Sequence, residues 1–136
     1  CREDDTEVVA LFVITPEEWR AHDVAPVRVE LILRTLSALR ERLAELNIPL
    51  RIVRSGSVAE TPRLVVDTAV ACGCTRIAAN REHEVNETKR DAAVLELARA
   101  RGIEACYFTD QVALEPESIR TGEGRFCTVC TAIKKN

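Results

Sequence analysis

A continuous apolar run near the start of the chain is the feature that most constrains the fold. Val8 to Ile14 is apolar at every position and ends at Thr15-Pro16. A run of strand length without polar alternation suits a strand buried on both faces, as strands are in a parallel sheet. Parallel strands are joined by right-handed crossovers, usually through helices. The run therefore predicts an α/β fold.

The rest of the chain supplies these crossovers, because helical and strand patterns alternate along it. From Val27 to Leu46, apolar residues recur at spacings of four and three, which is typical of an amphipathic helix. Thr61, before Pro62, is the expected N-cap of a second helix, and Asn86 can cap a third. The predicted elements are strands over 7–15, 48–53, 75–79 and 103–108, a polar loop over 16–26, and helices over 27–46, 62–72 and 87–101. This order predicts a Rossmann-like three-layer α/β/α domain with a mainly parallel sheet.

Composition bounds the partners of this domain. The 136 residues suffice for one domain with one core. The net charge of -3 argues against strong nucleic-acid binding by this part alone, since phosphate neutralisation needs clustered positive charge. No apolar run approaches the roughly 20 residues that span a bilayer, and the start lacks a signal-peptide core. We expect a cytoplasmic domain without membrane contact or a metal site, whose close cysteine pairs, Cys72/Cys74 and Cys127/Cys130, are reduced thiols.

Polar side chains gather at two predicted strand-to-helix junctions. Glu82 to Glu87 follows the third strand, and His22 lies in the loop after the first. The carboxyl ends of parallel strands meet along one crevice, where open α/β sheets bind ligands. An Asn amide both donates and accepts, and a Glu carboxylate accepts two N–H donors. Asn86 and Glu87 therefore suit the amino-pyrimidine edge of a flat heterocycle, on which His22 would stack or to which it would add a hydrogen bond.

The same residues also fit structural roles. Asn86 can cap its helix, Glu87 can complement the helix dipole in the first turn, and His22 can be a solvated loop residue. The usual phosphate-binding glycine motifs do not occur in this chain, so the sequence predicts no phosphate-binding loop. Spacing alone leaves a ligand site and these structural roles as alternatives.

Three segments carry a likeness to a known family. They are Thr15-Pro16-Glu17-Glu18-Trp19-Arg20-Ala21-His22, the helix between Pro26 and Pro49, and Glu84-Val85-Asn86-Glu87 followed by Arg90-Asp91. They resemble the N-terminal α/β domain of DNA photolyases in the photolyase/cryptochrome family. The greatest similarity is to the bacterial class I cyclobutane pyrimidine dimer photolyases. The likeness extends from about Cys1 to Lys135.

The resemblance implies a light-harvesting role. In that family this domain holds an antenna chromophore, commonly 5,10-methenyltetrahydrofolate, and the family's folate contacts match His22, Asn86 and Glu87 here. The antenna passes excitation to reduced FAD in a separate helical domain, and the flavin repairs pyrimidine dimers in DNA. The whole protein would be a deoxyribodipyrimidine photo-lyase, whereas this domain would hold no catalytic residue. The alternative is a non-catalytic folate- or nucleotide-binding Rossmann-like module, or a cryptochrome-type photoreceptor domain.

The two ends of the chain depart from the family pattern. The chain opens at Cys1 and contains no methionine, so residue 1 is not expected to be a translation start. The family's first strand, which bears a WFR-DLR-type motif at the centre of the sheet, has no counterpart here, and its two neighbours would keep unpaired edges. Residues 1–110 would then form a photolyase-type domain truncated at its start, and 111–136 an exit segment toward an FAD-binding domain. Phe126 to Ile133, which no proline interrupts, can form an extra strand in the central position.

Overall fold

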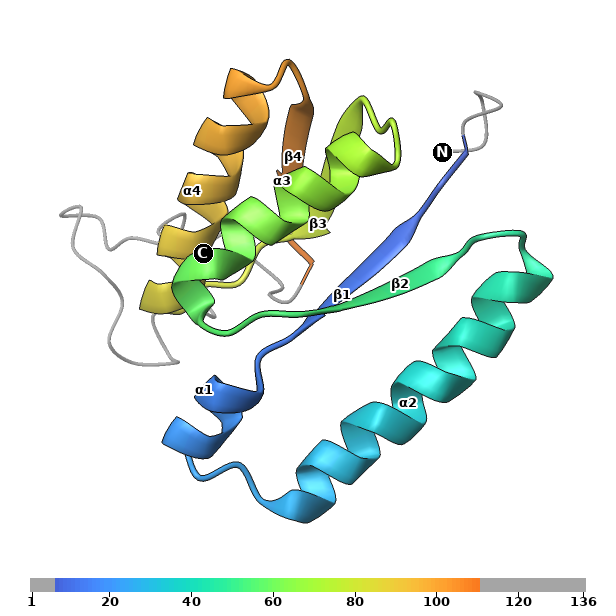
Figure 1. The fold of residues 1–136 in the computed structure, drawn as a ribbon, viewed down its shortest axis with the longest axis vertical. Helices are drawn as coiled ribbons and strands as arrows, with labels where there is room; N and C mark the ends of the chain where they lie inside the picture. The colour runs from blue at the N-terminus through green and yellow to red at the C-terminus, as the bar shows by residue number, and fades with distance from the viewer. Residues whose placement is uncertain (1–6, 111–136) are drawn as a thin grey trace, which may run out of the picture.

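The computed structural model describes residues 7–110 and shows strands that alternate with helices (Figure 1). This alternation confirms the predicted α/β class. In chain order the elements are β1 (Ala10–Ile14), α1 (Pro16–Ala21), α2 (Pro26–Glu45), β2 (Leu50–Arg54), the short 3₁₀ helix η1 (Val58–Glu60), α3 (Thr61–Ala71), β3 (Arg76–Asn80), α4 (Val85–Ala100) and β4 (Glu104–Phe108). None of the helices in this part of the chain is long and apolar enough to cross a membrane.

The strands form two parallel pairs. Ala10 of β1 lies opposite Leu50 of β2, and Arg76 of β3 lies opposite Glu104 of β4. Within residues 7–110, neither β1 nor β3 has a partner on its second edge. The predicted extra strand at 126–133 and the exit segment 111–136 lie outside the described residues.

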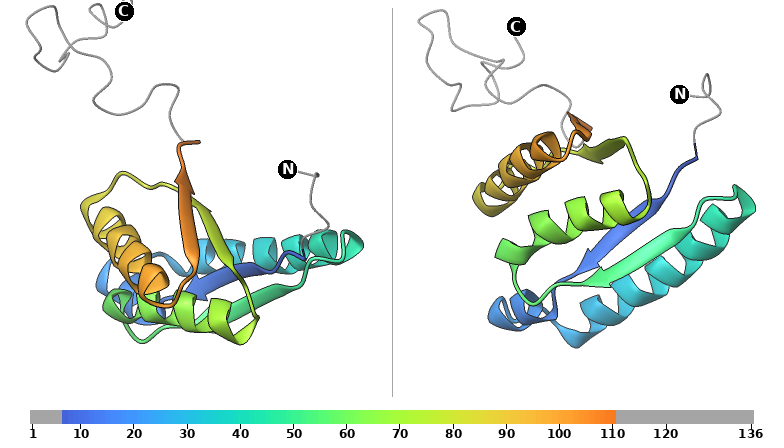
Figure 2. Two further views of the ribbon diagram at one scale, coloured as in Figure 1. Left: turned by 90° about the horizontal axis from the view of Figure 1, so that it is seen from above. Right: turned by 45° about the horizontal axis from the view of Figure 1, so that its top comes forward.

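Helices cover the strands from two sides. α2 packs against β2, whereas α3 packs against β1 and α4. Two views show α2 and α3 on opposite sides of the β1–β2 pair (Figures 1 and 2). α4 in turn packs against β4. The predicted order of helix, strand and helix layers is thus seen at the β1–β2 pair, whereas β3 and β4 form a separate sheet.

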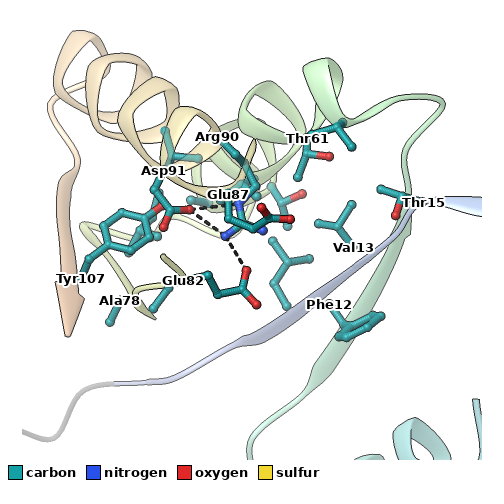
Figure 3. A pocket seen from close by; sticks show the side chains of 18 of the residues that line it. Phe12, Val13, Thr15, Thr61, Ala78, Glu82, Glu87, Arg90, Asp91 and Tyr107 are labelled. Carbon is teal, nitrogen blue, oxygen red and sulfur yellow. Dashed lines mark hydrogen bonds and ion pairs between the residues drawn. The ribbon is translucent and has the colours of Figure 1, made fainter. Parts of the chain in front are cut away.

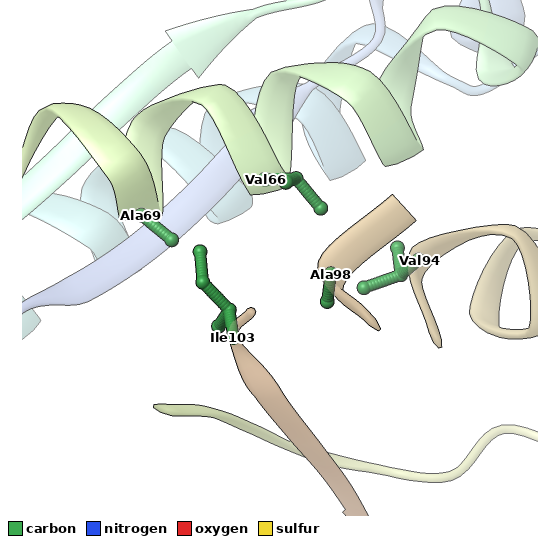
Figure 4. Close-up of a cluster of buried hydrophobic side chains, with 5 residues drawn as sticks. All are labelled: Val66, Ala69, Val94, Ala98 and Ile103. Carbon is green, nitrogen blue, oxygen red and sulfur yellow. The ribbon is translucent and has the colours of Figure 1, made fainter. Parts of the chain in front are cut away.

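The main hydrophobic core joins α3 and α4 to the β3–β4 pair. Val66 and Ala69 of α3 lie beside Val94 and Ala98 of α4 and beside Ile103, and all five are almost fully buried (Figure 4). Burying a valine side chain stabilises a fold by about 1.5–3 kcal/mol. The cluster therefore fixes the axis of α4, whose first turn carries two of the predicted site residues.

The structure corrects the prediction of a polar loop over residues 16–26. Residues Pro16–Ala21 form the helix α1 inside that range. Pro16 occupies the first helical position and two glutamates lie in the first turn, both of which favour a helix start. At six residues, α1 is too short to show an apolar period.

Both predicted N-caps are also wrong. Thr61 is the first residue of α3, because η1 runs directly into that helix. Asn86 is the second residue of α4, and Glu84 occupies the N-cap position without a side-chain capping bond. Asn86 therefore does not cap α4, so helix capping is no longer an alternative to ligand binding for this residue.

Candidate functional site

A cavity of about 630 Å³ lies between the two strand pairs (Figure 3). Consecutive residues of β1 and of β3 line it, together with α3, α4 and Tyr107 of β4. Its polar lining comes mainly from the segments that follow β1 and β3, at the carboxyl ends of these strands. The polar residues there are Thr15, Glu18, His22, Glu82, Asn86, Glu87, Arg90 and Asp91.

The helix α1 positions His22 at the cavity. Glu18 and Trp19 of α1 and His22 directly after it line the cavity together, as expected for positions separated by one helical turn. His22 follows the last helical residue, and its Nε2 lies 3.0 Å from Oε1 of Glu18. Within the described residues, its Nδ1 has no hydrogen-bond partner. The imidazole is therefore oriented by Glu18 and keeps one nitrogen for another partner.

The first two turns of α4 supply the opposite polar wall. Asn86, Glu87, Arg90, Asp91 and Val94 all line the cavity. These positions form one stripe on a helix, because residues three and four apart are neighbours. The buried Val94 holds this stripe against the core. Packing of α4 therefore turns its polar side chains toward the cavity.

Arg90 organises the charges on this wall. Its Nε and Nη2 donate to Oδ1 of Asp91 at 2.9 and 2.8 Å, and Nη2 also donates to Oε2 of Glu82 at 2.9 Å. Burial alone would lower the pKa of Arg90, but the hydrogen bonds and charges of Asp91 and Glu82 outweigh it and leave that pKa raised. Arg90 thus stays a cation shared by two carboxylates.

Asp91 is the most deeply buried of these groups. Its side chain is 9% exposed, and Oδ2 accepts no hydrogen bond in the described part of the chain. Tyr107 lies beside it (Figure 3). Burial and then the Asp91 charge raise the pKa of Tyr107 to about 12, so its hydroxyl stays protonated at neutral pH.

One carboxylate remains available at the cavity. Glu18 is paired with His22, and Arg90 binds both Glu82 and Asp91. Among residues 7–110, the side chains of Glu87 and Asn86 have no hydrogen-bond partner. A flat ring with adjacent N–H donors would meet a free carboxylate and a free amide at this place.

The three predicted site residues, His22, Asn86 and Glu87, line the same cavity although they are far apart in sequence. Their contact with a ligand stays a prediction. The sequence interpretation did not assign a site role to Glu82, Arg90, Asp91 or Tyr107. Arg90 and Asp91 follow Glu87 by three and four residues, and this helical spacing could have placed them at the same cavity. No sequence pattern indicated that Tyr107 lines it.

Fold and cavity together define a domain of the α/β class whose cavity carries polar groups at the carboxyl ends of parallel strands, where open α/β sheets bind ligands. The sequence profile described as DNA photolyase matches residues 1–136. The chain therefore belongs to the DNA photolyase family.

Individual relatives agree with this assignment. The chain is 35% identical to the deoxyribodipyrimidine photo-lyase of Vibrio cholerae over 128 residues, 94% of this chain and 27% of the relative. It is 33% identical to that of Escherichia coli over 135 residues, 98% of this chain and 28% of the relative. It is 37% identical to that of Halobacterium salinarum over 121 residues, 89% of this chain and 24% of the relative. The chain thus spans about a quarter of the length of these relatives.

Proposed function

We propose that this chain is the light-harvesting domain of a deoxyribodipyrimidine photo-lyase and that its cavity holds a folate-type antenna chromophore. One observation carries the proposal. In a chain of the DNA photolyase family, Asn86 and Glu87 line a cavity with His22 and are without partners among the described residues. These groups match the hydrogen-bonding edge of an amino-pyrimidine ring.

The side chains of His22, Asn86 and Glu87 fit 5,10-methenyltetrahydrofolate in particular. Glu87 would accept two N–H bonds from the amino-pyrimidine edge, and Asn86 would donate to and accept from its neighbouring atoms. His22, oriented by Glu18, would stack on the ring or add a hydrogen bond. When bound, the folate supplies absorption of near-ultraviolet or blue light. The residues of this chain hold and orient it.

Repair itself would take place elsewhere in the protein. We infer that a helical domain binds FAD and the pyrimidine-dimer-containing DNA, since the relatives are longer than this chain and carry the name photo-lyase. The net charge of -3 accords with a domain that does not itself bind the DNA backbone. Such a protein would act in the cytoplasm, where the cysteines would remain thiols.

Absorption and repair measured on the intact purified protein test this proposal. The expected result is a flavin spectrum with an added near-ultraviolet band after reconstitution with 5,10-methenyltetrahydrofolate. Light absorbed in that band should drive repair of DNA that contains cyclobutane pyrimidine dimers. A protein that binds folate or nucleotide without light-driven repair would instead be the non-catalytic module or a photoreceptor domain.

A further inference from the structure

Three polar side chains on one wall of the cavity form a hydrogen-bonded network to which the proposed function assigns no role. They are Glu82 in the segment after β3, and Arg90 and Asp91 on α4 (Figure 3). The network runs from the loop 81–84 to α4. It therefore connects the segment that precedes Asn86 and Glu87 with a packed helix.

The loop 81–84 has few other ties. At its start, the backbone N–H of Arg81 donates to the carbonyl of Phe108 at 2.8 Å, and at its end the N–H of Thr88 donates to the carbonyl of Glu84 at 2.9 Å. Two side chains of α4 also hold the loop: the Thr88 hydroxyl donates to the Glu84 carbonyl at 2.8 Å, and Arg90 forms an ion pair with Glu82. Within residues 7–110, the Glu82–Arg90 pair is the one tie made by a side chain of the loop itself. The placement of the loop over α4 thus depends on Arg90.

Asp91 gives Arg90 a fixed orientation. Two nitrogens of the guanidinium converge on Oδ1 of Asp91, and this carboxylate is buried on a helix that the core holds in place. Charge-assisted bonds of this kind are stronger and more directional than neutral ones. Solvent screens a partly buried pair less than an exposed one. The guanidinium is therefore a rigid connector between α4 and Glu82.

We propose that Arg90 is a positioning residue for the ligand site. Anchored by Asp91, it holds Glu82 and the loop 81–84 against α4, and this fixes the entry into the turn that carries Asn86 and Glu87. It also occupies the Glu82 carboxylate, so the N–H groups of a ligand meet Glu87 without a competing free acceptor. The statement about the ligand rests on the proposed function, whereas the anchoring of the loop does not.

Hydrogen exchange in the ligand-free intact protein tests the anchoring. Glu82→Gln removes the charge that Arg90 binds. It should speed exchange of the Arg81 and Thr88 amides up to about fivefold, the size expected for loss of one partly exposed ion pair. Glu96→Gln is the control, because it removes an exposed carboxylate of α4 that lies outside the loop and does not line the cavity. Equal exchange in the Glu82→Gln variant and the parent would overturn the proposal.

Titration with 5,10-methenyltetrahydrofolate tests the consequence for binding. Glu82→Gln and Arg90→Lys should each weaken affinity several-fold, and the double variant should lose no more than either single one, because both break the same connection. A parent protein that binds no folate would refute the proposed function, and the exchange experiment would still decide the anchoring. Full affinity in the Glu82→Gln variant, beside a folate-binding parent, would refute the positioning role.

Discussion

Replacing Glu87 by alanine removes the one carboxylate at the cavity that is without a partner in residues 7–110. A hydrogen bond to a charged group contributes about 1.5–3 kcal/mol. Because Glu87 is only partly buried, we expect a loss of about 1.5–2 kcal/mol, which corresponds to a roughly ten- to thirtyfold weaker affinity for 5,10-methenyltetrahydrofolate. Titration of the folate absorption band in the intact protein measures this change.

The control for Glu87→Ala is Glu96→Ala. Glu96 is an exposed carboxylate farther along α4 and outside this cavity, so its removal changes the net charge by the same amount. Melting curves of both variants show whether the helix stays folded, since an acidic residue in the first turn contributes about 0.3–1 kcal/mol through the helix dipole. Equal folate affinity in Glu87→Ala and the parent would show that Glu87 is only a first-turn residue. An equal loss in Glu96→Ala would show a general charge effect.

Three further predictions concern the scaffold. Val94→Ala should destabilise the protein by about 2–3 kcal/mol in denaturant unfolding, because Val94 is almost fully buried in the core, and an unchanged midpoint would contradict that burial. Asp91→Asn should lower the pKa of Tyr107 from about 12 without bringing it to the usual value, since burial remains; tyrosinate absorption in this chain measures it. Because the pKa of Tyr107 is raised in the folded chain, its hydroxyl ionises less readily there than in the unfolded chain. The contribution of Tyr107 to the free energy of unfolding should therefore be complete below pH about 10 and fall by about 1 kcal/mol, after allowance for solvent, as pH rises toward about 12. Equal unfolding midpoints at the two ends of this range would refute it.

The sequence predicted the strands and long helices well because local signals determine them. Apolar runs gave the four strands, and residues with positive φ end the helices where expected, at Asn47, Gly73 and Gly102. Burial was less predictable. The apolar stripe predicted from Val27 to Leu46 contains Leu36, which is buried in α2, and Leu39, which is 41% exposed. The period of a helix gives its apolar face, whereas the extent of burial depends on the elements that reach that face.

The site was predictable only in part for the same reason. That His22, Asn86 and Glu87 lie at one cavity could be predicted, because chain topology brings the carboxyl ends of parallel strands together. The network around Arg90 could not be predicted, because its partners Asp91 and Glu82 lie one and eight residues away and their contacts depend on how α4 packs. The separate strand pairs follow from hydrogen bonds that no local pattern encodes.

The most direct test of the central claim is to map where 5,10-methenyltetrahydrofolate binds. Amide chemical shifts of the isotopically labelled protein would be followed as the folate is added. The proposed function predicts saturable shifts in the segment 15–22 and in the segment 82–91, which meet at the cavity. Saturable shifts confined to the opposite end of α4, around 95–105, or no saturable shifts at all, would contradict it.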